Sequence, residues 1–154
     1  MRPTLTNYFL EIAYIVSTRS TCLRRHVGAV AVRDKRILAT GYNGAPAGAR
    51  HCNDTGCLRE QLRVRSGENH ELCRALHAEQ NVIVQAAVHG ISLVGCDLYL
   101  TTAPCVICAK MIANTGMRRV IFTGFYPDDQ AIITLGESEV EQVQVDVEQH
   151  LTCK

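Results

Sequence analysis

The sequence predicts an α/β fold in which helices and strands pack in layers. Three observations lead to this prediction. Strand-like and helix-like patterns alternate along the chain after residue 70, and residues 4–18 place apolar side chains on one face at helical spacing. The chain has 154 residues, 47% of them hydrophobic. That is enough for the core of one domain and too little for two, so we expect a single domain over residues 1–154.

The N-terminal part is predicted to form a helix and then a β-hairpin. Residues 4–18 form the helix, and residues 27–32 and 36–40 are strand-like runs joined by a tight turn at residues 34–35. The second run ends in the segment GYNG at residues 41–44, which is typical of a turn.

The middle of the chain is predicted to be irregular and then helical. Residues 45–69 are rich in Gly, Arg, Cys and His, with at most a short helix around residues 58–65. An irregular segment of this length in a compact domain usually has a function or is held by a cross-link such as a metal ion. We therefore treat residues 45–73 as a Cys/His-rich insertion. A helical pattern follows from about residue 71 to residue 89 and ends at Gly90.

The C-terminal part alternates between the two kinds of structure. We expect strands at residues 93–102 and 119–124, a helix at residues 104–114, and a short helical segment at residues 131–135. Residues 143–147 alternate valines with polar residues, which predicts a last strand at the edge of the sheet.

Composition excludes several classes of protein. The formal net charge of +1 gives no basis for general nucleic-acid binding. No apolar run approaches the roughly 18 residues of a membrane helix, and the N-terminus does not resemble a signal peptide. We therefore expect a cytoplasmic protein with neither a membrane nor a nucleic acid as partner. Eight cysteines without a secretion signal favour metal binding or catalysis over disulfides.

The chemistry is concentrated in two short motifs, His77-Ala78-Glu79 and Pro104-Cys105-Val106-Ile107-Cys108. A catalytic zinc site needs three nitrogen or thiolate ligands, and His77, Cys105 and Cys108 supply them. At a helix start the two sulfurs face the same way, and the positive end of the helix dipole favours thiolates. Glu79 does not have to ligate. We expect it to take the proton of the metal-activated water and pass it to a leaving nitrogen.

A C-x-x-C pair alone also fits a structural zinc half-site or a redox pair, but the full pattern is that of the zinc nucleobase deaminases. The resemblance extends over about residues 5–147. It rests on residues 20–30 (STCLRRHVGAV), 41–46 (GYNGAP), 73–81 (CRALHAEQN) and 102–105 (TAPC), which resemble the deoxycytidylate deaminase family.

The resemblance implies hydrolytic deamination of dCMP to dUMP and ammonia, which supplies dUMP for dTMP synthesis. It implies a three-layer α/β/α sandwich of the cytidine-deaminase type, with a central mixed sheet of about five strands. It also implies a homohexamer that dCTP activates and dTTP inhibits, with Mg accompanying the bound triphosphate.

The resemblance also suggests substrate-binding residues. Asn43 matches a position that contacts the sugar, and Tyr126 matches an aromatic residue near the nucleotide. A turn residue with a left-handed backbone is an equally good interpretation of Asn43. For the phosphate we expect a guanidinium group, with Arg24 the first candidate. The other candidates, some of them for an effector site between subunits, are Arg25, Arg50, Arg59, Arg63, Arg65 and Arg74.

Some members of this family carry a structural zinc in the Cys/His-rich segment. By this resemblance Cys22, Cys52, His70 and Cys73 would hold a second zinc, with Cys57 and His51 as substitutes. The alternative is a set of buried thiols without metal, because the spacing is not that of a standard zinc finger.

Other deaminases and one non-enzyme remain as alternatives. A tRNA adenosine deaminase or a single-stranded DNA deaminase would need a basic surface that a net charge of +1 does not supply. A free-nucleoside deaminase needs no phosphate site and usually has Cys at the position of His77, and the deaminase of riboflavin biosynthesis has a longer cysteine segment. A non-catalytic zinc-binding interaction module would have no use for the unligated Glu79.

Overall fold

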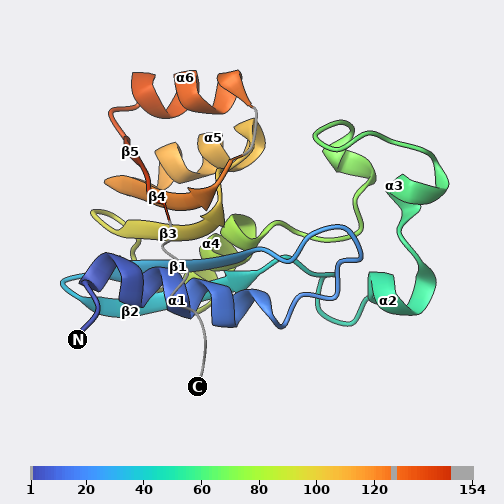
Figure 1. The fold of residues 1–154 in the computed structure, drawn as a ribbon, viewed down its shortest axis with the longest axis horizontal. Helices are drawn as coiled ribbons and strands as arrows, with labels where there is room; N and C mark the ends of the chain where they lie inside the picture. The colour runs from blue at the N-terminus through green and yellow to red at the C-terminus, as the bar shows by residue number, and fades with distance from the viewer. Residues whose placement is uncertain (1, 126–127, 147–154) are drawn as a thin grey trace.

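The computed structural model of the chain describes residues 2–125 and 128–146, so Tyr126 lies outside the described residues. The regular elements alternate along the chain (Figure 1). In chain order they are α1 Leu5–Ser17, β1 Gly28–Arg33, β2 Arg36–Tyr42, α2 Cys52–Thr55, α3 Leu58–Gln61, the 3₁₀ turn η1 His70–Leu72, α4 Ala78–Val88, β3 Asp97–Thr102, α5 Val106–Thr115, β4 Arg119–Gly124, α6 Asp129–Glu137 and β5 Glu141–Gln144.

The strands form one mixed sheet of five, in the order β2-β1-β3-β4-β5. β1 pairs antiparallel with both β2 and β3, whereas β3, β4 and β5 are parallel to one another. The hairpin between β1 and β2 turns at Asp34 and Lys35, whose φ angles of 51° and 63° are those of a type I′ turn. The predicted α/β class and the five-stranded mixed sheet are therefore confirmed.

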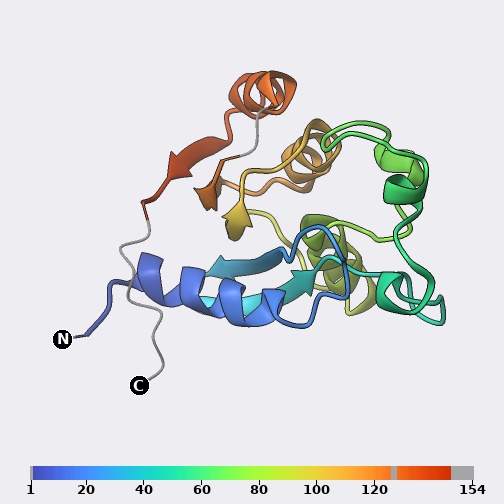
Figure 2. The ribbon, with the colours of Figure 1, turned by 45° about the vertical axis from the view of Figure 1, so that its right-hand side comes forward.

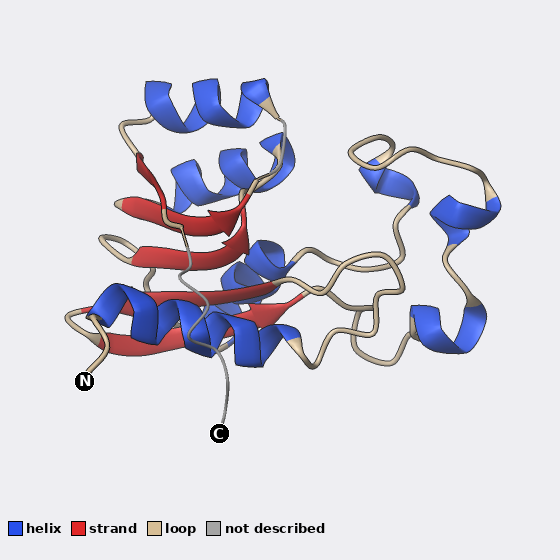
Figure 3. Ribbon diagram, viewed as in Figure 1, coloured by secondary structure: helices blue, strands red, loops and turns tan. Residues whose placement is uncertain are grey.

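Helices cover both faces of the sheet, which gives the expected three layers (Figures 2 and 3). α1 packs on one face, where its Phe9 and Leu10 meet Tyr99 and Ile121. α4, α5 and α6 pack on the other face, around a larger core of buried side chains. The central strands are buried on both faces, which explains why they appear in the sequence as nearly continuous apolar runs.

Gly28 allows α1 to approach β1 very closely. A Cβ atom built on Gly28 would lie 1.9 Å from the carbonyl oxygen of Ala13 in the middle of α1. No side chain fits in that space. The contact fixes α1 against β1, the strand that directly follows the Cys22–Val27 segment.

Several boundaries differ from the predicted ones because long-range pairing overrides the local pattern. α4 begins at Ala78 and not at residue 71, since Leu76 exchanges backbone hydrogen bonds of 2.9 and 3.1 Å with Gly44. β3 begins at Asp97, after a turn in which Gly95 has φ 75°. β5 covers residues 141–144, earlier than the predicted 143–147, and residue 147 lies outside the described residues.

The segment between Gly44 and Leu76, which we call the arm, contains the short helices α2 and α3 and the turn η1. Its two ends are joined by the bridge between Gly44 and Leu76. In Figure 1 the arm lies beyond one end of the sheet, on the side where β1 begins. Among the described residues, no helix combines the length and the hydrophobicity that a membrane crossing requires.

Candidate active site

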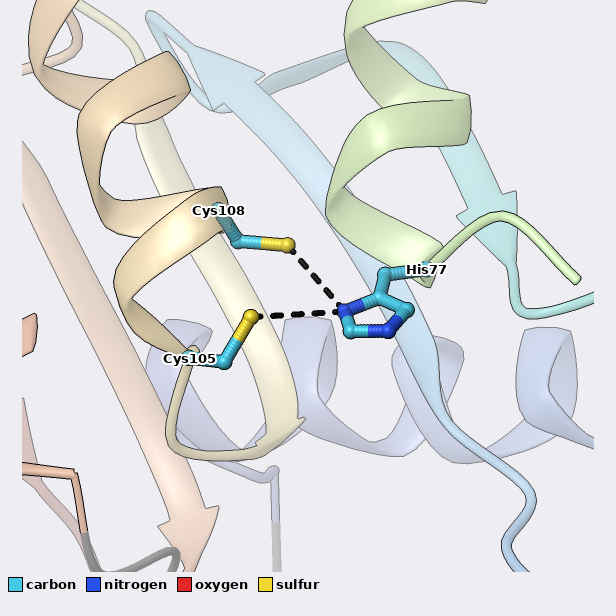
Figure 4. Close-up of side chains that lie close together, drawn as sticks. All are labelled: His77, Cys105 and Cys108. Carbon is cyan, nitrogen blue, oxygen red and sulfur yellow. Dashed lines mark hydrogen bonds between the residues drawn. The ribbon is translucent and has the colours of Figure 1, made fainter. Parts of the chain in front are cut away.

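His77, Cys105 and Cys108 converge in the structure as the motifs predict (Figure 4). The Nδ1 atom of His77 lies 3.5 Å from the Sγ atom of Cys105 and 3.4 Å from that of Cys108. The three donor atoms all lie within 4.8 Å of one another. No other set of three or more His, Cys, Asp or Glu donors among the described residues is as compact.

The ligands stand where two helices begin. His77 is the N-cap of α4 and Cys105 is the N-cap of α5, both with extended backbone, so their side chains project from the helix ends. Cys108 follows one turn into α5. The backbone N–H of His77 donates to the Gln80 side chain at 2.8 Å, which fixes the entry into α4.

This arrangement fits zinc. Zinc–sulfur bonds of about 2.3 Å and zinc–nitrogen bonds of about 2.0 Å at a tetrahedral angle place S and N about 3.5 Å apart. The two measured S–N separations match that edge length. The donor set of one imidazole and two thiols with no fourth protein ligand is the pattern of a catalytic zinc site, which leaves a position for water or substrate.

The pKa values of the three ligands are shifted by their contacts with one another. Hydrogen bonds from Cys108 and then from His77 hold the pKa of Cys105 at about 4. The Cys108 pKa is raised by its hydrogen bond to Cys105 and by burial. The hydrogen bond to Cys105 likewise raises the pKa of His77. A cation that binds here must therefore displace the protons that the raised pKa values of Cys108 and His77 favour.

Glu79 lies in the first turn of α4, next to the three ligands, and is only 3% exposed. Burial raises the pKa of its carboxyl group. It is not part of the compact donor set. A buried carboxyl group with a raised pKa beside a metal site is suited to accept and return a proton.

The site opens into one cavity that the sheet and the arm line together. The residues that line it include members of the metal site, one asparagine, several cysteines and four arginines. The polar members that matter here are His77, Glu79 and Cys105; Asn43; Arg24, Arg25, Arg59 and Arg74; and Cys22, Cys52, Cys57, His70 and Cys73. Among the described residues that line it, Glu79 is the only acid against four arginines, although the chain's net charge is only +1.

Asn43 is buried at this cavity and ties the chain ahead of β1. Its Oδ1 accepts from the Val27 N–H at 2.8 Å, and its Nδ2 donates to the Arg25 carbonyl at 2.8 Å. Asn43 is absent from the residues with positive φ, so the interpretation as a left-handed turn residue is wrong. The amide instead holds the segment that carries Arg24 and Arg25.

The structure separates the candidate arginines. Arg24 lines the cavity, and its Nη1 donates to the Val64 carbonyl in the arm at 3.3 Å. Arg50, Arg63 and Arg65 are exposed and are not among the cavity-lining residues.

The residues predicted for the second zinc, Cys22, Cys52, His70 and Cys73, all line this cavity. Burial first, and then the neighbouring thiols of Cys22, Cys57 and Cys73, raise the pKa of Cys52. His70 lies instead against His77, with the two rings edge to face and 5.0 Å between centroids. His70 begins the turn η1, and the backbone N–H of Cys73, which follows that turn, donates to the His70 carbonyl at 3.0 Å.

Asp128 is a site residue that the sequence interpretation missed. Its carboxylate accepts from the Val106 N–H at 2.8 Å and from the Ala131 N–H at 3.1 Å. It therefore caps α5, directly behind Cys105, as well as α6. An aspartate just ahead of an apolar segment is a recognised N-cap signal, so the pattern was available in the sequence.

Comparison with known proteins places this site in a family. A model described as the cytidine and deoxycytidylate deaminase zinc-binding region matches residues 3–124. The chain belongs to this deaminase family. The matched region contains His77, Glu79, Cys105 and Cys108, whereas the cap residue Asp128 lies beyond it.

Individual deaminases are similar to this chain over most of its length. The deoxycytidylate deaminase of Schizosaccharomyces pombe is 39% identical over 136 residues, which are 87% of this chain and 41% of that protein. The chain thus spans about two-fifths of that relative's length. A deoxycytidylate deaminase of Mycobacterium phage D29 is 40% identical over 126 residues, covering 79% of this chain and 95% of the phage protein.

A solved deaminase structure shares the fold as well. The crystal structure of dCMP deaminase from the cyanophage S-TIM5, in complex with dCMP and dUMP, superposes with a TM-score of 0.76 at 32% identity. The match covers 94% of this chain and 99% of the cyanophage chain. The chain therefore has the same fold as the cyanophage deaminase, which is the sandwich expected from the sequence resemblance.

Proposed function

We propose that the protein deaminates dCMP to dUMP and ammonia by hydrolysis. The observation that carries the proposal is the combination of a His/Cys/Cys zinc site, a buried Glu79 beside it, and a cavity that Glu79 and several arginines line together. A nucleoside monophosphate supplies the matching anion.

In this proposal the chain's own residues bind and move protons. His77, Cys105 and Cys108 hold the zinc, which when bound supplies Lewis-acid activation of a water molecule. Glu79 accepts the proton of that water. It delivers that proton to N3 of the cytosine ring, then takes a second proton from the hydroxyl group that has added to C4 and delivers it to the amine, which leaves as ammonia. The shielded position of Glu79 suits this double role, because burial raises the pKa of its carboxyl group.

The rest of the nucleotide would lie along the cavity. Asn43 is our candidate for the sugar, and Arg24 for the phosphate, since both line the cavity that contains Glu79. Tyr126 remains a proposed neighbour of the nucleotide on the strength of the family resemblance alone.

Replacing Glu79 by glutamine tests the proposal directly. We expect E79Q to keep its zinc and to lose at least about 100-fold of its kcat on dCMP, because the amide cannot take a proton. The exposed Glu71, replaced in E71Q, is the matched control and should leave kcat unchanged. Metal analysis and a dCMP-to-dUMP assay read both outcomes. Turnover by E79Q within tenfold of wild type would contradict the mechanism, and a zinc-loaded wild type without dCMP turnover would exclude this substrate.

We also propose a second, structural zinc in the arm. Cys22, Cys52 and Cys73 remain its ligands, with Cys57 in place of His70, because Cys57 is one of the thiols that act on Cys52. We expect two zinc ions per wild-type chain, one in C57S, and two in H70A. A single zinc in the wild type would mean that these thiols only pack.

The family resemblance supports further proposals about the assembly. We propose a cytoplasmic homohexamer that dCTP activates and dTTP inhibits, each with Mg. Light scattering and dCMP kinetics with and without each triphosphate test them together.

A further inference from the structure

Arg59 is a buried cation without a carboxylate. It belongs to α3, and only 8% of its surface is exposed, which is rare for an arginine that lacks an acidic partner. Among residues 2–125 and 128–146, no Asp or Glu forms an ion pair with it, and its buried Nε has no hydrogen-bond partner. A buried charge is tolerated when something pairs with it.

The arm fixes the direction of this guanidinium group. Its Nη2 donates to the carbonyl of Arg65 at 2.9 Å and to that of Glu68 at 2.6 Å. Arg24 donates to the carbonyl of Val64, one residue earlier in the same loop. The loop from residue 64 to residue 68 thus holds two guanidinium groups by neutral carbonyl oxygens, which orient them without neutralising their charge.

Both guanidinium groups belong to residues that line the cavity containing His77 and Glu79. The unused Nε donor therefore belongs to a residue beside the chemical site and not to one at a remote surface.

We propose that Arg59 binds the phosphate of the substrate and selects nucleoside monophosphates over nucleosides. This inference rests on the proposed dCMP deamination and adds a specificity residue to it. The phosphate dianion supplies the negative charge that no carboxylate among the described residues gives to Arg59. Its oxygens accept hydrogen bonds from the guanidinium N–H groups that do not bond to the two carbonyl oxygens. Because the arm carries Arg59, the arm contributes to distinguishing a nucleotide from a nucleoside, together with Arg24, which lies outside it.

The test compares dCMP with deoxycytidine as substrates of R59Q, R59K and the wild type. We expect R59Q to lower kcat/KM for dCMP by about tenfold or more, mainly through KM, and to leave that for deoxycytidine nearly unchanged. R59K should recover part of the loss, because a charge remains. The exposed Arg36, replaced in R36Q, is the charge-matched control and should change neither substrate.

A purely structural role for Arg59 predicts a different result. Loss of the two carbonyl bonds would disturb the site as a whole, so kcat/KM would fall in parallel for both substrates, and that outcome overturns the proposal. An unchanged preference in both variants overturns it as well. If R59Q does not fold, inhibition by inorganic phosphate decides with R59K, whose inhibition constant should rise. Absence of dCMP turnover in the wild type would instead refute the proposed function.

Discussion

Asn43 contributes both to the stability of the fold and to the geometry of the site. The N43A variant allows the two contributions to be measured separately. The side chain makes two hydrogen bonds of 2.8 Å, to the Val27 N–H and to the Arg25 carbonyl. Each buried backbone group that loses its partner costs about 1–3 kcal/mol. Val27 is half-buried and Arg25 is exposed, so water recovers part of the cost. We therefore expect N43A to lose about 2–3 kcal/mol of unfolding free energy.

Urea unfolding followed by circular dichroism measures this loss, with the exposed Asn53 as the matched position. N53A should change the stability by less than about 0.5 kcal/mol. The same variants assayed on dCMP should show a raised KM for N43A, because the segment with Arg24 loses its anchor. A stability of N43A equal to that of N53A would refute the assignment of Asn43 as a structural clamp.

Two further predictions concern the metal ligands and the helix contact. Zinc binding to the metal-free protein at neutral pH should release protons from Cys108 and from His77, whose pKa values are both raised, and none from Cys105, whose pKa is about 4. Affinity should then rise with pH, and calorimetry in buffers of different ionisation enthalpy would show no proton release if this reasoning fails. G28A should destabilise the protein by about 3 kcal/mol or more, because its Cβ would meet the Ala13 carbonyl at 1.9 Å. G136A, which has no atom within 4 Å of the new Cβ, should gain about 0.5–1 kcal/mol, and equal effects in urea unfolding would contradict the packing argument.

The metal site and the sheet could be predicted because their signals are local. His77, Cys105 and Cys108 belong to two short motifs at helix starts, and the spacing of apolar residues distinguishes strands from helices. These features depend on neighbours a few residues away, and the structure reproduces them.

Features set by distant contacts could not be predicted in the same way. Leu72 and Leu76 have helical spacing, yet Leu76 pairs with Gly44, and this bridge delays the start of α4. The ring of His70 lies edge to face against the ring of His77, a contact that the spacing between His70 and Cys73 does not predict. The burial of Arg59 depends on how the loop at residues 64–68 folds back over α3, and no composition or spacing rule predicts that.

The arm begins and ends at one short bridge between Gly44 and Leu76. Protein engineers look for such a junction, because a segment whose two ends already meet can be exchanged without re-registering the sheet around it. The three residues of the catalytic metal site, His77, Cys105 and Cys108, lie outside this exchangeable segment, whereas Arg59 and three of the cysteines proposed for the second zinc lie inside it. A library of arms grafted between residues 44 and 76 would therefore vary substrate choice while leaving the bond-breaking machinery untouched.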